Sequence, residues 1–186
     1  MIDLSRAFLP DSVTVEGRSF LIHTDFRFWI NFVRRVKNIE EQTYEDFDFL
    51  FDGELPENKK EAFEALCRFA FPVSELPRKT DSEKSDVIPY DFDLDADYIF
   101  AAFYQQYRID LCDDKLRLHW YKFMALFNGL KDTKFDDIVG WRFFVPGEKH
   151  DAEKEKLKLR QKWEIKHTLT KKEKETIENF RKHLKC

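Results

Sequence analysis

Glycine is scarce in this 186-residue chain, and its glycines form none of the loops that bind phosphate groups. A total of 5 glycines favours helices over an all-β architecture. Neither G-x-x-x-x-G-K nor G-x-G-x-x-G occurs, so no phosphate-binding loop is recognisable. The G-x-S-x-G motif that carries a nucleophilic serine is missing as well. These absences remove common sequence signals of nucleotide-binding enzymes and serine hydrolases.

Cysteines and long apolar runs are equally scarce. The three cysteines, Cys67, Cys112 and Cys186, form no C-x-x-C pair, and no secretion signal is visible. An odd number of cysteines without such a signal predicts free thiols in a reducing cytoplasm, with Cys67 buried on an apolar helix face. No apolar run approaches the ~18 residues of a membrane-spanning helix. We therefore expect a cytoplasmic protein without a membrane segment.

Acidic residues suggest a metal site at one place only. Asp91, Asp93 and Asp95 have the spacing of the first ligands of a calcium-binding loop. Ala96 and Ala102 occupy the positions where that loop needs glycine and an acidic ligand. The alternative is that these acids begin a helix, where carboxylates accept hydrogen bonds from free N–H groups and favour the positive end of the helix dipole. We expect helix capping, and no metal or cofactor.

His119 is the most conspicuous single polar residue, because it lies within an apolar pattern. A buried general base is one interpretation. A histidine hydrogen-bonded to the backbone or to an acid is the favoured one, because no nucleophile or second acid lies at a suitable spacing. The sequence therefore predicts a protein that is not an enzyme. A metal-dependent enzyme using the acids of residues 91–97 is the minor alternative.

Aromatic residues are abundant, with 20 phenylalanines and a total aromatic share of 16%. Each large ring can bury ~150–250 Å², and a domain of this size has a limited interior. Some rings are therefore candidates for an interface. The net charge of −4 gives the whole chain no strong attraction to nucleic acid.

The N-terminal part predicts a β-hairpin followed by helices. Residues 13–15 and 19–22 alternate apolar and polar side chains around the turn Glu16-Gly17. Thr24-Asp25 predicts the start of a helix that extends to Val36, whose basic outer residues indicate a solvated face or, less commonly, a phosphate contact. Residues 43–51 predict a short helix. Pro56-Glu57 opens the next helix, which carries an apolar face and stops at Pro72: Phe63, Leu66, Cys67 and Ala70.

The segment Tyr90–Leu130 predicts the centre of the fold. Tyr98–Tyr104 is uncharged and mostly apolar, and a helix that is apolar all round must be buried by its neighbours. A second amphipathic helix is predicted from Leu116 to Phe127, ending at Asn128-Gly129. A short helix then begins at Asp132-Thr133.

The remaining segments are polar. Residues 73–89 predict an exposed, mobile loop. Residues 148–186 contain 13 Lys or Arg and 8 Asp or Glu, a net charge of +5. We therefore expect a mainly α protein: a compact helical domain over residues 1–147, with a short N-terminal β-hairpin, and a charged helical C-terminal tail over residues 148–186. Lys166–Cys186 is expected to be dispensable for folding, because few contacts hold such a terminus.

Several segments in order resemble a family of small proteins from tailed phages and prophages, named after gene product fifteen of a siphophage. The resemblance covers about residues 5–165, and Lys166–Cys186 looks like an addition. The segments that carry it are Leu9-Pro10-x-x-Val13, Thr24-Asp25-Phe26-Arg27-x-Trp29-Ile30, Tyr90-Asp91-Phe92, Asp95-Ala96-x-Tyr98-Ile99-x-Ala101-Ala102-Phe103, Gln105-Gln106-Tyr107-x-Ile109-Asp110-Leu111, Leu118-His119-Trp120-x-Lys122-Phe123-x-Ala125-Leu126 and Gly129-Leu130.

The resemblance implies a place in the phage tail module, between the major tail protein and the tape-measure protein, where tail assembly chaperones are usually encoded. It transfers no catalytic residue. We expect a chaperone that binds the tape-measure protein, and possible partners include other tail proteins and a second copy of the chain, but not nucleic acid or a membrane. A structural tail or connector component is the alternative. The candidate contact residues are Trp120, Phe123, Phe127 and Trp141.

Overall fold

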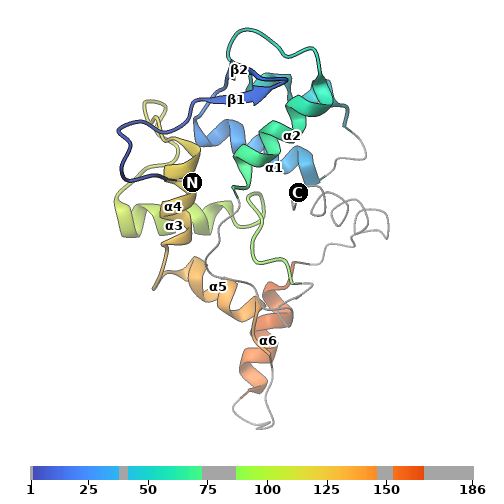
Figure 1. Cartoon of the computed structure of the whole chain (residues 1–186). Helices are drawn as coiled ribbons and strands as arrows, with labels where there is room; N and C mark the ends of the chain where they lie inside the picture. The colour runs from blue at the N-terminus through green and yellow to red at the C-terminus, as the bar shows by residue number, and fades with distance from the viewer. Residues whose placement is uncertain (1, 38–41, 73–86, 146–152, 166–186) are drawn as a thin grey trace. The chain divides into compact units, whose positions relative to one another are not determined.

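The computed structural model describes residues 2–37, 42–72, 87–145 and 153–165, and these form a mainly α protein with one β-hairpin (Figure 1). The chain divides into two compact units. Unit 1 contains the described residues up to 72 together with 117–124. Unit 2 contains the described residues of 87–116 and 125–165. The predicted boundary at residue 147 lies outside the described residues and stays a prediction.

The N-terminal hairpin of unit 1 confirms the prediction from alternating residues. Strands β1 (Ser12–Val15) and β2 (Arg18–Leu21) are antiparallel, with Val13 opposite Phe20. Both turn residues, Glu16 and Gly17, have positive φ angles of 49° and 78°, as a two-residue hairpin turn that matches the strand twist requires. The buried face of β1 packs on helix α2 (Lys59–Ala70), which supplies the support that a lone hairpin lacks.

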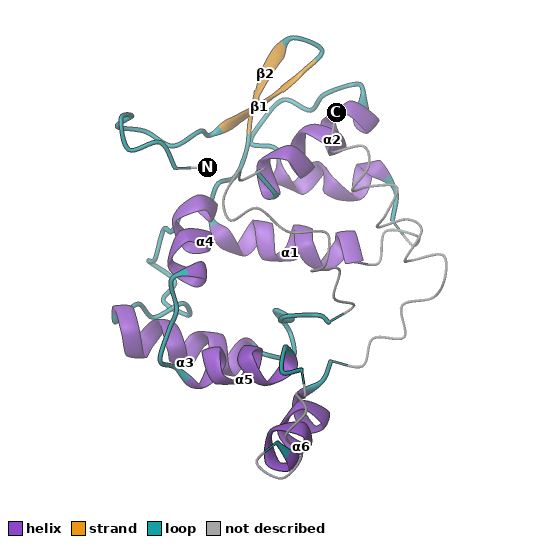
Figure 2. Ribbon diagram, turned by 60° about the horizontal axis from the view of Figure 1, so that its bottom comes forward, coloured by secondary structure: helices purple, strands orange, loops and turns teal. Residues whose placement is uncertain are grey.

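Helix α1 (Phe26–Lys37) begins where the capping pattern predicts. The Asp25 carboxylate accepts a hydrogen bond from the N–H of Arg27 (3.0 Å), which satisfies one free donor of the first turn. Trp29 and Phe32 point into the core of unit 1 and are fully buried. The ribbon view in Figure 2 shows α1 as one unbroken helix.

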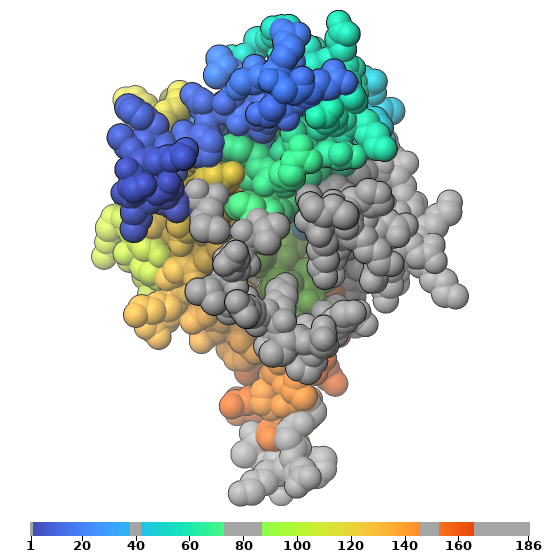
Figure 3. Space-filling view, in the orientation of Figure 1, coloured from blue at the N-terminus to red at the C-terminus, as the bar shows by residue number. Residues whose placement is uncertain are grey.

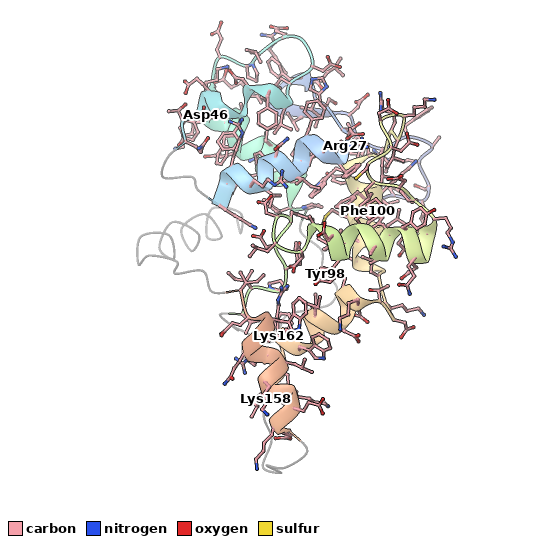
Figure 4. The ribbon with its side chains drawn as sticks, turned by 180° about the vertical axis from the view of Figure 1, so that it is seen from behind. Arg27, Asp46, Tyr98, Phe100, Lys158 and Lys162 are labelled. Carbon is pink, nitrogen blue, oxygen red and sulfur yellow. The ribbon has the colours of Figure 1, made fainter. Side chains whose placement is uncertain are left out.

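Two basic side chains on the outer face of α1 are bonded to other groups of the protein. Arg27 lies 3.3 Å from the Asp25 carboxylate, and Arg35 donates to the carbonyl oxygen of Asp46 (3.1 Å). The Arg35 guanidinium also lies over the Phe49 ring. Arg27 and Asp46 are labelled in Figure 4.

Two further helices complete the N-terminal part of unit 1. Residues Tyr44–Leu50 form the short helix η2, which is a 3-10 helix. Helix α2 begins at Lys59, three residues later than predicted, because the Asn58 side chain caps it by accepting from Glu61 N–H (3.1 Å). Pro56 instead lies buried in the loop before the helix. The predicted apolar face of α2 is confirmed, since all four of its side chains are buried: Phe63, Leu66, Cys67 and Ala70.

The predicted second amphipathic helix begins later than its pattern indicates. Helix α4 runs from Trp120 to Asn128, while Leu118 and His119 form an extended segment beside the start of α1. Phe26 N–H donates to the carbonyl oxygen of Leu118 (2.9 Å), and Trp120 N–H donates to that of Thr24 (2.7 Å). Tertiary pairing therefore overrides the local helical pattern at Leu118 and His119.

Unit 2 is built from helices α3 (Ala96–Tyr107), α5 (Lys134–Arg142) and α6 (Lys154–Trp163), with the last residues of α4. Helix α5 packs against both α3 and α6. The Thr133 hydroxyl oxygen caps α5 by accepting from Asp136 N–H (3.2 Å), as the sequence predicts.

Glycine ends helix α4, also as predicted. A Cβ atom on Gly129 would lie 3.0 Å from the Tyr107 hydroxyl oxygen. That hydroxyl donates to the carbonyl oxygen of Leu126 (2.9 Å), so the side chain that a substitution would displace is itself hydrogen-bonded.

Helix α3 is not buried all round, so the prediction of a fully covered central helix is wrong. Ile99, Ala102 and Phe103 are buried, but Ala101 is exposed and Tyr104 is 50% exposed. The largest fully buried rings, those of Trp29 and Trp120, belong to unit 1 instead.

Two polar segments of the sequence lie mostly outside the described residues. Of the predicted loop 73–89, only residues 87–89 are described. Of the predicted tail 148–186, residues 153–165 are described and contain α6, while Lys166–Cys186 lie outside. None of the helices that are described has the length and apolar character needed to cross a membrane.

Candidate partner-binding surfaces

Two of the four predicted contact residues lie in the core of unit 1. Trp120 is 1% exposed, and its indole N–H donates to the carbonyl oxygen of Ala70 (3.0 Å). Phe123 is fully buried, with its ring stacked on that of Phe26 at a centroid distance of 4.7 Å. The rings of Trp120 and Phe123 also stack on each other, 5.7 Å apart.

The other two predicted contact residues lie in unit 2. Phe127 is buried against the rings of Tyr90 (4.8 Å between centroids) and Phe135 (5.3 Å). Trp141 is half-buried, and its ring lies 5.9 Å from that of Trp163. Trp141 is therefore the one of the four with substantial exposed area. Contact of the four residues with a partner stays a prediction.

His119 is hydrogen-bonded to the backbone through both ring nitrogens. Nδ1 accepts from the N–H of Tyr121 (3.0 Å), so the proton of the neutral ring lies on Nε2, which faces the carbonyl oxygen of Pro10 (2.9 Å). Burial is the largest cause that lowers the pKa of His119, and the bond to Pro10 partly opposes it. This arrangement confirms the expectation of a backbone-bonded histidine, and both ring nitrogens are occupied by structural bonds.

The acids of residues 91–97 organise the start of α3. Asp91 accepts from the N–H groups of Asp93 (2.7 Å) and Leu94 (3.0 Å). Asp95 occupies the N-cap position, but its side chain makes no capping hydrogen bond. The expected helix start is confirmed, with Asp97 in the first turn of α3, but the hydrogen bonds of Asp91 go to the turn before the helix rather than to α3 itself. Within the described residues, no group of three or more His, Cys, Asp or Glu side chains is placed to hold a metal ion.

The Asp95 carboxylate instead pairs with Arg142 inside unit 2. The two Arg142 NH groups donate to the two carboxylate oxygens at 2.7 and 2.8 Å, and the side chains are 3% and 2% exposed. Arg142 also donates to the carbonyl oxygens of Pro89 (3.0 Å) and Trp163 (2.8 Å). One side chain thus connects α3, α5, the end of α6 and the segment before Tyr90. The signal in the sequence was a single arginine within the apolar run of residues 138–145.

The cysteines that are described follow the prediction of free thiols. Cys67 is buried and Cys112 is exposed, and neither forms a disulfide. Burial raises the pKa of the Cys67 thiol far above its ordinary value, which makes it unreactive.

An open hollow of about 440 Å³ lies beside the hairpin of unit 1. Its polar lining includes His23, Asp25 and Asp52. The His23 ring is stacked on Phe28 at a centroid distance of 4.4 Å, and the Asp25 carboxylate accepts from the N–H of Arg27 in α1. Both side chains therefore already have structural roles.

An apolar strip lies on the side of α3 away from its buried residues. We call Phe100, Ala101 and Tyr104 the α3 outer face. Phe100 is half-buried, and its ring is nearly parallel to that of Tyr104 at a centroid distance of 6.3 Å. Ala101 and Tyr104 are exposed. Phe100 is labelled in Figure 4.

A second surface of unit 2 combines tryptophan and lysine side chains. We call Lys134, Trp141, Trp163 and Lys162 the tryptophan–lysine row. The Lys134 Nζ lies 4.0 Å from the Trp141 ring centroid, and the Lys162 Nζ lies 5.7 Å from that of Trp163. The two rings are 5.9 Å apart, and the edge of Tyr98 packs against Trp163. The surface therefore offers half-buried rings flanked by positive charges.

The family model described as bacteriophage Gp15 protein matches residues 6–185. The chain belongs to this family. It is therefore a phage protein. No curated protein and no solved structure matches it. The match corrects the expectation that the resemblance ends near residue 165. The charged C-terminal stretch lacks distinctive residues, so one sequence alone did not reveal that it belongs to the Gp15 family.

Proposed function

We propose that this Gp15-family protein is a tail assembly chaperone that binds the phage tape-measure protein in the host cytoplasm, and that it is not an enzyme. Membership of a phage family supports the general setting. The observation that supports binding is the α3 outer face, which leaves apolar area exposed on an apolar helix.

The composition of α3 explains why a partner helix would cover that face. Asp97 is the only charged residue among the twelve of α3. Such a helix is stable when neighbours cover most of its circumference, whereas the described neighbours bury the side of Ile99, Ala102 and Phe103. On this proposal, the tape-measure protein presents apolar helical faces until the tail tube encloses it. Its apolar face would pack along the α3 outer face, as amphipathic helices pack into apolar grooves.

Co-expression with the tape-measure protein tests the proposal. We expect the wild-type chain to co-purify with the tape-measure protein and to increase its soluble yield. Ala101→Glu and Tyr104→Glu each place a charge on the α3 outer face, so each should abolish co-purification. Ala125→Glu is the matched control, because it places the same charge at an exposed helical alanine of α4.

The outcomes separate the proposal from its alternative. Failure of the wild-type chain to co-purify or to raise solubility would overturn the chaperone function. Equal binding by the variants would move the contact away from α3. Mass spectrometry of purified particles tests the alternative of a structural tail or connector component. Stoichiometric amounts of this chain in mature tails would favour that alternative.

A further inference from the structure

An exposed acidic loop connects η2 and α2 in unit 1. Phe51 and Pro56 are buried and hold the loop at both ends. Asp52 N–H also donates to the carbonyl oxygen of Leu21 (3.0 Å), which fixes the loop to the hairpin. In Figure 3, cyan atoms of this part of the chain lie next to the blue atoms of the hairpin. The loop backbone is thus fixed in place before any partner binds.

The side chains between these anchors, and that of Glu57 directly after Pro56, face solvent. We call Asp52, Glu54, Leu55 and Glu57 the acidic loop, and all four are exposed. Leu55 is 44% exposed, so an apolar side chain is surrounded by carboxylates. Glu54 is paired with Arg18 at 2.8 Å. The wider segment of residues 42–64 contains two lysines, Lys59 and Lys60, and eight acids: Glu45, Asp46, Asp48, Asp52, Glu54, Glu57, Glu61 and Glu64.

The tryptophan–lysine row has the opposite character. Helix α6 carries one acid, Glu155, and five basic residues: Lys154, Lys156, Lys158, Arg160 and Lys162. Lys158 and Lys162 are one turn apart, so they share a face of the helix, and both are exposed (Figure 4). The exposed parts of Trp141 and Trp163 lie between lysines, and aromatic rings of this kind are frequent anchors of protein interfaces.

We propose that the acidic loop of one copy of this protein docks on the tryptophan–lysine row of a second copy. Leu55 packs against the rings of Trp141 and Trp163. The carboxylates of Asp52 and Glu57 lie beside the lysines at the ends of the row. Charge complementarity selects this occupant, because the chain itself supplies both an acidic apolar surface and a basic aromatic one.

The two surfaces are different, so one docking contact leaves a free row on the first copy and a free acidic loop on the second. The pair therefore either closes by a second, reciprocal contact into a two-fold dimer or adds further copies in a ring or chain. Surface charges are screened beyond ~8 Å at physiological ionic strength, so association is strongest at low salt.

Sedimentation velocity of the purified chain alone tests the proposal. We expect the mass-average sedimentation coefficient to rise with protein concentration at low salt and to fall when salt is added. Leu55→Ser removes the apolar anchor from an exposed position. Lys134→Glu with Lys162→Glu reverses the basic side, and Asp52→Lys with Glu57→Lys reverses the acidic side. Each variant should weaken self-association about tenfold or more.

A fourfold variant that combines both pairs of charge reversals gives the most discriminating measurement. Opposite charges then face each other again, so self-association should return in the fourfold variant. Lys115→Glu with Lys131→Glu is the control, because it makes the same change of net charge at two exposed lysines elsewhere in unit 2. Circular dichroism confirms that every variant remains folded.

Three results would overturn the proposal. They are a sedimentation coefficient independent of concentration at low salt, association that the two reversed pairs leave unchanged, and a fourfold variant as weak as either pair. None of these measurements involves the tape-measure protein. Failure here therefore leaves the proposed chaperone function open, and failure of co-purification leaves self-association open.

Discussion

The two units of this protein stabilise their interiors in different ways. Unit 1 packs rings against rings, with Trp29 beside Phe32, Phe69 and Trp120. Unit 2 also contains rings, but it places a fully buried ion pair, Asp95–Arg142, among its helices.

This difference predicts how each unit tolerates change. Apolar packing accepts a smaller ring at a moderate loss of stability, because dispersion and burial scale with the atoms that remain. A buried ion pair does not accept the loss of one partner, because the remaining charge is left without compensation in an apolar environment. Unit 2 should therefore be the more sensitive unit at a single position.

The largest effect is expected for Arg142→Met. The substitution leaves the Asp95 carboxylate buried without its counter-charge, and it leaves the carbonyl oxygens of Pro89 and Trp163 without their donor. We expect a loss of ~3–5 kcal/mol in the free energy of unfolding, measured by urea denaturation.

A double variant separates the charge from the packing at this site. Asp95→Asn combined with Arg142→Met removes both charges and keeps an acceptor for the Asp91 N–H. It should be more stable than Arg142→Met alone. A single Arg142→Met variant that loses less than ~1 kcal/mol would contradict the comparison between the units.

A smaller effect is expected for Trp120→Phe in unit 1. The phenyl ring can still pack against Trp29 and Phe123, but the indole N–H to the Ala70 carbonyl oxygen is lost. We expect a loss of ~1–3 kcal/mol from the unpaired carbonyl group and the reduced volume. Urea denaturation measures it, with Trp163→Phe at a half-buried position as the control that should lose less. A loss equal to that of Arg142→Met would remove the distinction between the units.

The smallest effect is expected from the titration of His119 in unit 1. Burial lowers the pKa of this histidine from its ordinary value of 6.5, so the folded protein binds the proton less well than the unfolded chain. Its contribution to stability is therefore complete above pH 6.5 and decreases as the pH falls below that value. Thermal melting between pH 7.5 and 5 should show the decrease, and His119→Gln should reduce the slope. An unchanged slope in the variant would assign the pH dependence to other groups.

The sequence correctly predicted the turns and helix ends that depend only on neighbouring residues. The turn Glu16-Gly17, the cap at Asp25 and the cap at Thr133 lie where the sequence places them. Each depends on backbone conformation or on hydrogen bonds spanning a few residues, so propensity and spacing are sufficient. The mainly α fold with its hairpin follows from these elements.

Long-range pairing explains the predictions that differ from the structure. The pattern of residues 116–119 fits a helix, yet the backbone of residues 118–120 pairs with residues 24–26 at the start of α1. The partners of Leu118 are about ninety residues away, beyond the range of any local rule. Helix α3 illustrates a second limit, because its apolar composition predicts burial without showing which sides other helices cover.

The candidate binding surfaces were likewise predictable from the sequence only in part. The residue types of Trp141, Lys162 and Leu55 are visible in the sequence, but their exposure and their neighbours are not. Trp120 and Phe123 lie in a sequence pattern as apolar as that around Trp141. They are nevertheless in the core, because the first residues of α4 pack against the rings of unit 1.

The sequence alone determined the helical content, the hairpin, most helix ends and the resemblance to a phage family, because these depend on composition, local spacing and the order of short segments. Tertiary structure alone decided which aromatic residues are buried, that Asp95 pairs with Arg142 across 47 positions, and that Leu118 and His119 are extended. The physical reason is that burial and ion pairing are properties of groups brought together by folding. They depend on distances in space, which composition and local periodicity do not encode.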